Sequence, residues 1–224
     1  NPMLPSQTVE NYLKTIFLAQ AADPASEELV PMGRIAGALG VVPGTATTMI
    51  KTLAESGLVR YEPYMGVRLT PAGEKLAGLV LRRHRLIELF LVKVLNMSWA
   101  EVHDEAEQLE HAVSEGLIDR IDEMLGRPAV DPHGDPIPSA EGRVPTLNHV
   151  DLLTAPLNAP MVVTRVIDQD PEFLRFLEHQ RLMPGQPVTV EHRDGASDSV
   201  RLLVSGQTVT IGTRAASKVL AQPI

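Results

Sequence analysis

Histidine and carboxylate side chains recur at helical spacing near the middle of the chain. Residues 103–111 read His-Asp-Glu-Ala-Glu-Gln-Leu-Glu-His. Side chains three or four positions apart share one face of a helix, so His103, Glu107, Glu110 and His111 would project together. Crowded carboxylates repel one another unless a positive charge lies between them. A divalent metal ion is the simplest charge of this kind, and the spacing therefore predicts a metal site.

A second pair of the same chemistry precedes this stretch. His84 and Glu88 lie four positions apart on another predicted helix. The alternative for this pair is a surface hydrogen bond worth only ~0.2–0.5 kcal/mol. The alternative for 103–111 is a solvated acidic helix, because Asp104 and Glu105 add further charge. Two such clusters in one chain, beside the DNA-binding pattern described below, favour metal ligation for both.

Composition limits the classes of protein that this chain can be. Its 224 residues are 44% apolar and 21% charged, which suits one large globular domain or two to three small ones. Cysteine is absent, which excludes disulfides, thiolate metal ligands and thiol nucleophiles and fits a reducing cytosol. No apolar run approaches the roughly 18 residues that span a bilayer. We therefore expect a cytoplasmic protein with no membrane partner.

Charge is distributed unevenly along the chain. The formal net charge is −8, which alone argues against nucleic acid as a partner. Residues 42–85, however, hold seven Lys and Arg against three Glu, whereas residues 86–142 hold three basic and thirteen acidic residues. A basic block beside an acidic block indicates two separate functions, the first compatible with nucleic acid.

The first 73 residues have the pattern of a winged helix-turn-helix. Apolar spacing predicts a helix from Thr8, a short helix over 32–39 that Gly40 ends, and a third helix over 45–56. Two extended runs, 58–62 and 67–70, then flank a turn that contains Gly66, which predicts a β-hairpin. A hairpin directly after a helix-turn-helix is a wing.

The remaining chain divides into helices, a linker and strands. A long helix is predicted from Pro71 to about Leu95, then a helix that carries 103–111 and ends near Gly116, and a shorter helix over 117–125. The segment 128–160 holds seven prolines and little periodicity, and 161–224 contains short alternating strands typical of a small β-barrel. The expected fold class is α+β with several domains, divided as follows: a winged helix-turn-helix over 1–73, an all-α domain over 74–127, a proline-rich linker over 128–160 and a β-barrel over 161–224.

These features together resemble the diphtheria toxin repressor family of metal-dependent transcription regulators, and the resemblance covers nearly the whole chain. Its most specific motifs are His84-Arg85-Leu86-Ile87-Glu88, the stretch 103–111 and Ser114-Glu115. The resemblance implies a winged helix, a helical domain for metal binding and dimerisation, and a C-terminal SH3-like domain. It also implies a metal-activated repressor that binds a palindromic double-stranded operator as a homodimer and controls metal-ion homeostasis.

The resemblance also implies two metal sites per chain. An ancillary site would use His84, Glu88 and His103, completed from the third domain by Asp170 and Glu172. A regulatory site would use Glu107, Glu110 and His111, helped by Asn11 from the first helix. The remaining histidines His133, His149, His179 and His192 have no partner at ligand spacing, and we expect them to be ordinary surface residues.

The residue at position 107 bears on the identity of the metal. By resemblance, iron-responsive relatives have Cys there and manganese-responsive relatives have Glu. A hard carboxylate in place of a soft thiolate favours Mn²⁺, with Fe²⁺ as the alternative. Asn11 departs from both types, which have Met or Asp there. Lys14 stands where manganese-responsive relatives carry a carboxylate.

Two surfaces are expected to contact partners. The start of the second helix of a helix-turn-helix enters the major groove, and the wing follows the backbone. The candidate DNA contacts are Pro43, Thr45, Thr47, Thr48, Lys51, Arg60 and Arg68, although a helix cap with a solvated face would explain the same residues. The candidate dimer contacts are Leu86, Phe90, Leu117, Ile118 and Ile121.

Two other functions remain as alternatives beside an iron-dependent regulator of the same family. The chain could be a constitutive winged-helix DNA binder whose metal is structural. It could also be a metallohydrolase with a glutamate base, but HExxH, GxSxG and glycine-rich phosphate motifs are missing from the sequence. An enzyme would also leave the winged helix unexplained, so we expect neither catalysis nor a small organic substrate.

Overall fold

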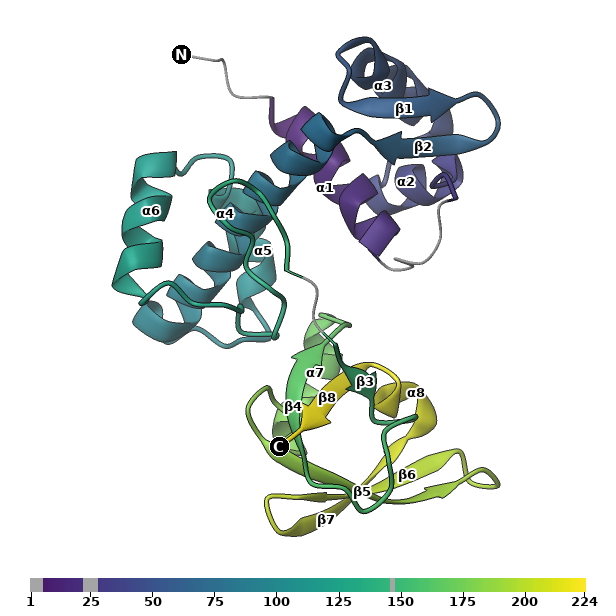
Figure 1. Ribbon diagram of the computed structural model, residues 1–224, viewed down its shortest axis with the longest axis vertical. Coiled ribbons are helices and arrows are strands. Elements are labelled where there is room, and N and C mark those ends of the chain that lie inside the picture. Colours follow the sequence, from purple (N-terminus) through teal and green to yellow (C-terminus); the bar gives the residue numbers. More distant parts are fainter. Residues whose placement is uncertain (1–5, 22–27, 146–147) are drawn as a thin grey trace. The chain divides into compact units, whose positions relative to one another are not determined.

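The structure is a computed structural model, and it describes residues 6–21, 28–145 and 148–224. The chain divides into two compact units (Figure 1). The first contains residues 1–83 and 138–144, and the second contains residues 84–137 and 145–224. Within the described ranges, no helix has the length and apolar character needed to cross a membrane.

The first unit is a winged helix, as predicted. Three helices, α1 (Gln7–Ala21), α2 (Met32–Leu39) and α3 (Pro43–Glu55), precede the antiparallel hairpin of β1 (Val59–Glu62) and β2 (Gly66–Leu69). α2 ends at Gly40, whose φ of 63° is a left-handed conformation that glycine adopts without strain. α3 begins at Pro43, where a missing N–H leaves no helical bond unmade.

Aliphatic side chains from every element fill the core of this unit. Leu13, Ile16, Ile35 and Ile50 are fully buried there. A buried ion pair supplements the apolar packing, because Arg83 Nη2 donates to Glu10 Oε1 at 2.6 Å. α1 is thereby held to the first half of α4 (Pro71–Leu95) by both packing and charge.

The segment 138–144 returns to the first half of α4. Arg82 Nη1 donates to the Pro138 carbonyl at 3.0 Å. A Cβ on Gly78 would lie 1.9 Å from the Gly142 carbonyl oxygen, so only glycine allows this approach. Part of the segment predicted as a linker is therefore packed against a helix.

The helices of the second unit are the rest of α4, α5 (Val102–Leu109) and α6 (Glu115–Met124). The prediction of one helix from 103 to about Gly116 was wrong. α5 ends at Leu109, and Ser114 starts α6 by accepting a hydrogen bond from the Leu117 N–H. Glu110 and His111 consequently lie in the turn between the two helices.

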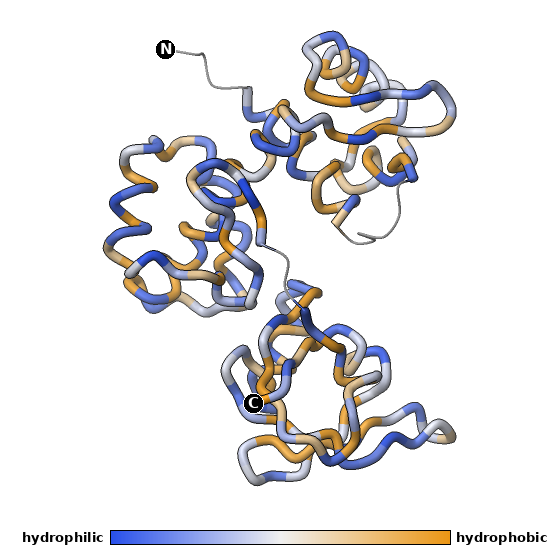
Figure 2. Tube along the Cα trace, viewed as in Figure 1, coloured by the Kyte–Doolittle hydropathy of each residue, from blue (hydrophilic) through white to orange (hydrophobic). Residues whose placement is uncertain are grey.

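The C-terminal part of the second unit is a curled antiparallel sheet with the strand order β3-β8-β4-β5-β6-β7 (Figure 1). Its elements are, in chain order, β3 (Val150–Asp151), β4 (Met161–Val166), α7 (Pro171–His179), β5 (Pro187–Asp194), β6 (Ser199–Val204), β7 (Gln207–Gly212), α8 (Thr213–Ala216) and β8 (Val219–Pro223). Buried positions alternate along β6, at Val200, Leu202 and Val204, as the period of two predicts. Figure 2 shows apolar and polar stretches mixed along the strands of this domain. The predicted SH3-like domain is confirmed.

Residues 131–137, hereafter the 131–137 loop, are ordered and mostly buried in the second unit. The Asp131 N–H donates to the Asp135 carbonyl at 2.9 Å, and Asp131 Oδ1 accepts from the N–H groups of His133 and Asp135. These bonds replace those of a helix or strand. The proline-rich composition correctly predicted irregular backbone here, but not its burial.

Candidate metal centre and DNA-contacting face

α4 places charged and polar side chains inside the second unit. His84 and Glu88 are one turn apart and are 5% and 0% exposed. The Nε2 of His84 lies 3.0 Å from the Glu88 Oε1. Burial of such groups is unfavourable unless they are paired or bind a metal. Their surroundings in α5 and in the 131–137 loop therefore decide what they do.

The predicted ancillary group is brought together. His103 on α5 faces α4, with its Nδ1 3.2 Å from both His84 Nε2 and Glu88 Oε1. One ligand atom from each of these three residues lies within 4.8 Å of the others, a spacing that suits a single metal ion. Two imidazoles and one carboxylate form a common donor set for divalent transition metals.

The predicted regulatory residues lie beside this group and share one member with it. His84, Glu107 and Glu110 also bring ligand atoms within 4.8 Å of one another. Glu110 is fully buried, and its Oε2 lies 2.6 Å from His84 Nδ1. His111 Nε2 lies 3.3 Å from the other oxygen of Glu110. The two predicted sites are thus joined through the two nitrogens of His84.

A third group, which the sequence did not predict, extends the cluster through Glu88. Glu88, Asp131 and His133 place ligand atoms within 4.8 Å of one another, and all three residues are buried. The expectation that His133 lies on the surface was wrong, since it is 0% exposed. The signal missed was an Asp-x-His pair inside a segment whose prolines indicated a linker.

Each member of this third group has a buried ligand atom with no hydrogen-bond partner among the residues that the structure describes. These atoms are Oε2 of Glu88, Oδ2 of Asp131 and Nδ1 of His133. Buried polar atoms are rarely left in this condition. Two carboxylate oxygens and one imidazole nitrogen aimed at a common point suit a divalent cation, so this group fits a metal.

The pKa values of Asp131 and Glu88 indicate that this cluster has too little positive charge for its carboxylates. Burial raises the pKa of Asp131, reinforced by the nearby carboxylates of Asp135 and Glu88, to about 8. Burial also acts to raise the pKa of Glu88, but the neighbouring histidines His103, His133 and His84 outweigh it and hold that pKa well below the ordinary range. Carboxylates competing for the same few partners are a favourable environment for a cation.

The remaining predicted ligands fall outside these groups. Asn11 lies on α1 in the first unit, where its Oδ1 is buried with no hydrogen-bond partner among the described residues. Asp170 and Glu172 are exposed, and neither belongs to a group of potential ligands found in the described ranges. Asp170 instead caps α7 by accepting from the Glu172 and Phe173 N–H groups. Metal ligation by these two acids stays a prediction.

The candidate DNA contacts lie on one helix and on the wing. Pro43, Thr45, Thr48 and Lys51 are exposed on α3, and Thr47 is half-buried. The Thr47 and Thr48 hydroxyls donate to the carbonyls four residues earlier, which leaves their oxygens able to accept.

In the wing, Arg60 pairs directly opposite Arg68 across the hairpin. Arg60 also forms an exposed ion pair with Glu62 at 2.5 Å, and Arg68 Nη1 donates to the Glu28 carbonyl at 3.5 Å. Two cations opposite each other on an exposed hairpin are compatible with contact to a phosphate backbone.

An apolar hollow of about 320 Å³ lies between α4, α5 and α6. Leu109, Leu117 and Met124 line it and are 38%, 48% and 58% exposed. Of the candidate dimer contacts, Leu117, Phe90 and Ile121 line this hollow. Leu86 and Ile118 are fully buried in the core of the unit, so their assignment as surface contacts was wrong.

A winged helix combined with a cluster of metal-ligand side chains defines a metal-responsive DNA-binding regulator. Three domain families match the chain: the N-terminal DNA-binding domain of iron-dependent repressors over 5–67, their metal-binding and dimerisation domain over 70–139, and the FeoA domain over 150–223.

Similar proteins lead to the same family. The iron-dependent repressor IdeR of Mycobacterium tuberculosis is 32% identical over 218 residues, covering 91% of this chain and 92% of IdeR. MntR of Lysinibacillus sphaericus is 33% identical over 54% of this chain and 84% of its own. A solved manganese-dependent transcriptional repressor in complex with manganese superposes with a TM-score of 0.86 at 38% identity, covering 96% of this chain and all of its own. This chain belongs to the iron-dependent repressor family, whose members are DNA-binding transcriptional repressors and not enzymes.

Proposed function

We propose that this protein is a manganese-activated homodimeric repressor that binds two metal ions per chain, with iron as the alternative metal. The observation that carries the proposal is the continuous cluster of buried histidines and carboxylates around His84 and Glu88 in a chain that begins with a winged helix. The function regulated would be metal-ion homeostasis, as in a regulator that senses the metal whose supply it controls. A repressor that binds a DNA operator is expected in the cytoplasm.

The first ion would be held around Glu88. Two donor sets share this carboxylate, one with His84 and His103 and the other with Asp131 and His133. The second ion would be held by Glu107, Glu110 and His111, with the Asn11 amide oxygen as an added ligand. Comparing His103→Gln with His133→Gln in a Mn²⁺ titration would show which histidine the first ion requires.

The donor atoms favour manganese. Cysteine is absent, so every candidate ligand is a carboxylate or amide oxygen or an imidazole nitrogen. Oxygen-rich sites suit Mn²⁺ and Fe²⁺, whereas softer donors would favour Zn²⁺. The solved relative described as manganese-dependent supports manganese, and IdeR, which is described as iron-dependent, keeps iron as the alternative.

Activation would follow because different conformations of the protein bind the metal ion with different affinity. α4, α5 and the 131–137 loop carry carboxylates that repel one another, and a bound cation supplies the charge that holds these segments together. If Asn11 also binds the metal, the same ion would hold α1 of the winged helix to these segments. A conformation that gathers all the ligands binds metal more tightly, so metal shifts the population toward it.

Operator binding would use a homodimer. Helix-turn-helix dimers place their recognition helices about 34–36 Å apart and bind palindromic sites. The exposed apolar hollow of α4, α5 and α6 is our candidate for the dimer contact. Leu117→Glu should yield monomers in sedimentation velocity, whereas Leu203→Glu, at an exposed leucine of β6, should not.

The decisive experiment is a DNA-binding titration with Mn²⁺, Fe²⁺ and Zn²⁺ side by side, using operator fragments selected from genomic DNA. Affinity should rise with Mn²⁺ and fall in excess chelator. Equal affinity in chelator would instead support a constitutive binder with a structural metal. In that case Glu107→Ala would lower the melting temperature without changing DNA affinity.

A further inference from the structure

Three consecutive exposed residues form the turn between β1 and β2, hereafter the wing tip: Pro63, Tyr64 and Met65. Tyr64 is 104% exposed and Met65 is 67% exposed. Aromatic residues make up only 4% of this chain, so a tyrosine left wholly in solvent is one that the cores do not use. A run of exposed apolar residues is unfavourable for the free protein unless it contacts a partner.

The base of the hairpin is fixed below the wing tip. Val30 N–H donates to the Val67 carbonyl at 2.8 Å, and Val67 N–H donates to the Val30 carbonyl at 3.0 Å. A Cβ on Gly66 would lie 2.5 Å from the Val30 carbonyl oxygen, so the two backbones touch there. Met65 N–H closes the turn by donating to the Glu62 carbonyl at 3.1 Å. The turn therefore extends beyond the helices of the first unit on a firmly held stem (Figure 1).

The backbone of Tyr64 is in a conformation that a bulky side chain disfavours. Its φ is 65°, in the left-handed region that Gly, Asn and Asp adopt more readily. Because the side chain is fully exposed and the backbone is strained, the folded state would be at least as stable with Asn at this position. Strained residues of this kind cluster at sites that bind a ligand.

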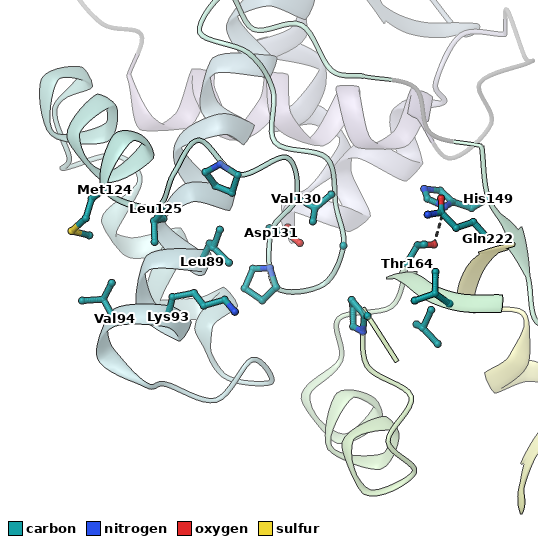
Figure 3. A pocket seen from close by; sticks show the side chains of 17 residues that line it. Leu89, Lys93, Val94, Met124, Leu125, Val130, Asp131, His149, Thr164 and Gln222 are labelled. Carbon is teal, nitrogen blue, oxygen red and sulfur yellow. Dashed lines mark hydrogen bonds between the residues drawn. The ribbon is translucent and has the colours of Figure 1, made fainter. Parts of the chain in front are cut away.

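The wing tip differs in shape from the apolar surface of the second unit. There, apolar side chains line a groove of about 930 Å³, with Leu89 and Lys93 on one side and Thr164 and Gln222 on the other (Figure 3). A groove is suited to receive a ligand, whereas a projecting turn is suited to enter a groove of its partner. The shape of the wing tip therefore favours a partner that has a groove.

Charges beside the wing tip indicate that this partner is anionic. Arg60 and Arg68 are paired directly across the hairpin. Arg60 forms an exposed ion pair with Glu62 at 2.5 Å, which a phosphate can replace because exposed ion pairs are weak. The surrounding residues 42–85 hold seven Lys and Arg against three Glu. Double-stranded DNA has both the negative charge and the groove.

We propose that the wing tip is an apolar wedge that enters the minor groove of the operator and bends it. Proteins that bend DNA from the minor groove insert side chains such as Met and Pro between base steps, which unstacks the step and kinks the duplex. Arg60 and Arg68 bind the phosphates on either side of the tip. The wing thereby selects operators by how easily a step opens, in addition to any contacts of α3 in the major groove. This inference rests on the proposed function, because the operator is its ligand.

The test uses the full-length protein with Mn²⁺ and operator duplexes that carry a donor dye at one end and an acceptor dye at the other. Energy transfer should show a bent operator with the wild type and a straighter one with the double variant Tyr64→Asn, Met65→Ser. The double variant should also bind about tenfold more weakly in fluorescence anisotropy, a loss comparable to that from one mismatched base pair. The matched control is Leu203→Ser, which removes an exposed apolar side chain of β6 and should bind and bend DNA as the wild type does.

Modified operators identify the groove that the wing tip enters. Replacing an adenine by 2,6-diaminopurine adds an amino group to the minor-groove edge of the base pair and leaves the major-groove edge unchanged. The wild type should lose affinity where this base lies under the wing tip, and the double variant should not. Chemical denaturation tests folding, and the double variant should unfold at no lower denaturant concentration than the wild type. If it unfolds earlier, Met65→Ser alone replaces it.

The outcomes separate this inference from the proposed function. If the wild type binds DNA equally with Mn²⁺ and in chelator, metal activation fails, and a bend that is lost in the double variant still supports the wedge. If Mn²⁺ activates both proteins and both bend the operator equally, only the wedge fails. If the double variant binds weakly but 2,6-diaminopurine does not affect the wild type, the tip contacts the backbone and the wedge is overturned. If the double variant changes the oligomeric state in sedimentation velocity without DNA, the tip is a contact between copies, which also overturns it.

Discussion

The proposed ligands on α4 and α5 and the proposed ligands in the 131–137 loop illustrate two ways of building one cluster. On α4 and α5, the ligands repeat at helical spacing, and His103 and Glu107 keep 43% and 36% of their side chains exposed. In the loop, Asp131 and His133 are buried and held by tertiary contacts alone. The exposed ligands suit exchange with metal in solution, and the buried ligands suit an ion that stays bound.

The largest effect expected is from Glu88→Gln, because Glu88 belongs to both the helical ancillary group and the loop group. The variant should lose one of the two proposed Mn²⁺ ions per chain and the thermal stabilisation that this ion gives, about 2.7 kcal/mol at one hundred times the dissociation constant. Melting curves with and without Mn²⁺ measure this loss. Glu105→Gln, at an exposed position of α5, is the control, and the comparison fails if both variants respond to Mn²⁺ alike.

The second expected effect tests whether the loop depends on close backbone contact. Gly134→Ala should destabilise the protein by about 2–3 kcal/mol, because a Cβ there meets the Thr164 carbonyl and the backbone has a positive φ. Gly185→Ala is the matched control: its φ is 90°, but its Cβ would have nothing within 4 Å. That variant should lose only about 1 kcal/mol. Equal losses in chemical denaturation would show that the loop is not tightly packed against β4.

Glu107→Gln tests the exposed half of the cluster. The substitution replaces a carboxylate by an amide of the same shape. Mn²⁺ binding at the regulatory site should therefore weaken about tenfold, equivalent to about 1.4 kcal/mol. DNA binding should then require correspondingly more Mn²⁺, while the loop group keeps its affinity. A fluorescence-anisotropy titration at several Mn²⁺ concentrations measures the shift, and an unchanged midpoint would remove Glu107 from the regulatory site.

The smallest effect concerns the ion pair of Lys218 and Asp168, which belongs to none of the three ligand groups found in the described ranges. A hydrogen bond from Lys218 lowers the pKa of Asp168 below its ordinary value of 3.8, so the pair stabilises the fold above that value and loses its effect as pH falls through the lowered pKa. Lys218→Met should raise the pKa of Asp168 in a carboxyl NMR titration. Lys218→Arg, which keeps the charge, should leave that pKa low, and a low pKa in both variants would refute the assignment.

Sequence patterns predicted those parts of the molecule that depend on local spacing. α4 runs from Pro71 to Leu95 as predicted, and helical periodicity correctly placed His84 and Glu88 on one face of it. The grouping of His103 with them, across two helices, was implied by the family resemblance alone. Short strands within 161–224 were also predicted from alternation, and β4 to β8 lie there. Helical periodicity and strand alternation, which depend only on neighbouring residues, thus predicted these elements correctly.

Features that depend on tertiary contacts were missed. Asp131 and His133 lie more than forty residues from Glu88 in the sequence, in irregular backbone without periodicity, and only the folded chain brings them together. Asp170, whose metal ligation stays a prediction, caps α7, a role that the Asp-Pro pair at a helix start favours by itself. Gln169, beside it, makes the contact with the loop that no spacing rule indicates.

The central claim is that the 131–137 loop completes the buried site that holds the first ion around Glu88, beside the regulatory site of Glu107, Glu110 and His111. The most direct measurement is the number of Mn²⁺ ions bound by the wild type and by the double variant Asp131→Asn, His133→Gln. The account predicts two ions for the wild type and one ion for the variant, with the affinity of the regulatory site (Glu107, Glu110 and His111) unchanged. A double variant that binds two ions with wild-type affinities would contradict it.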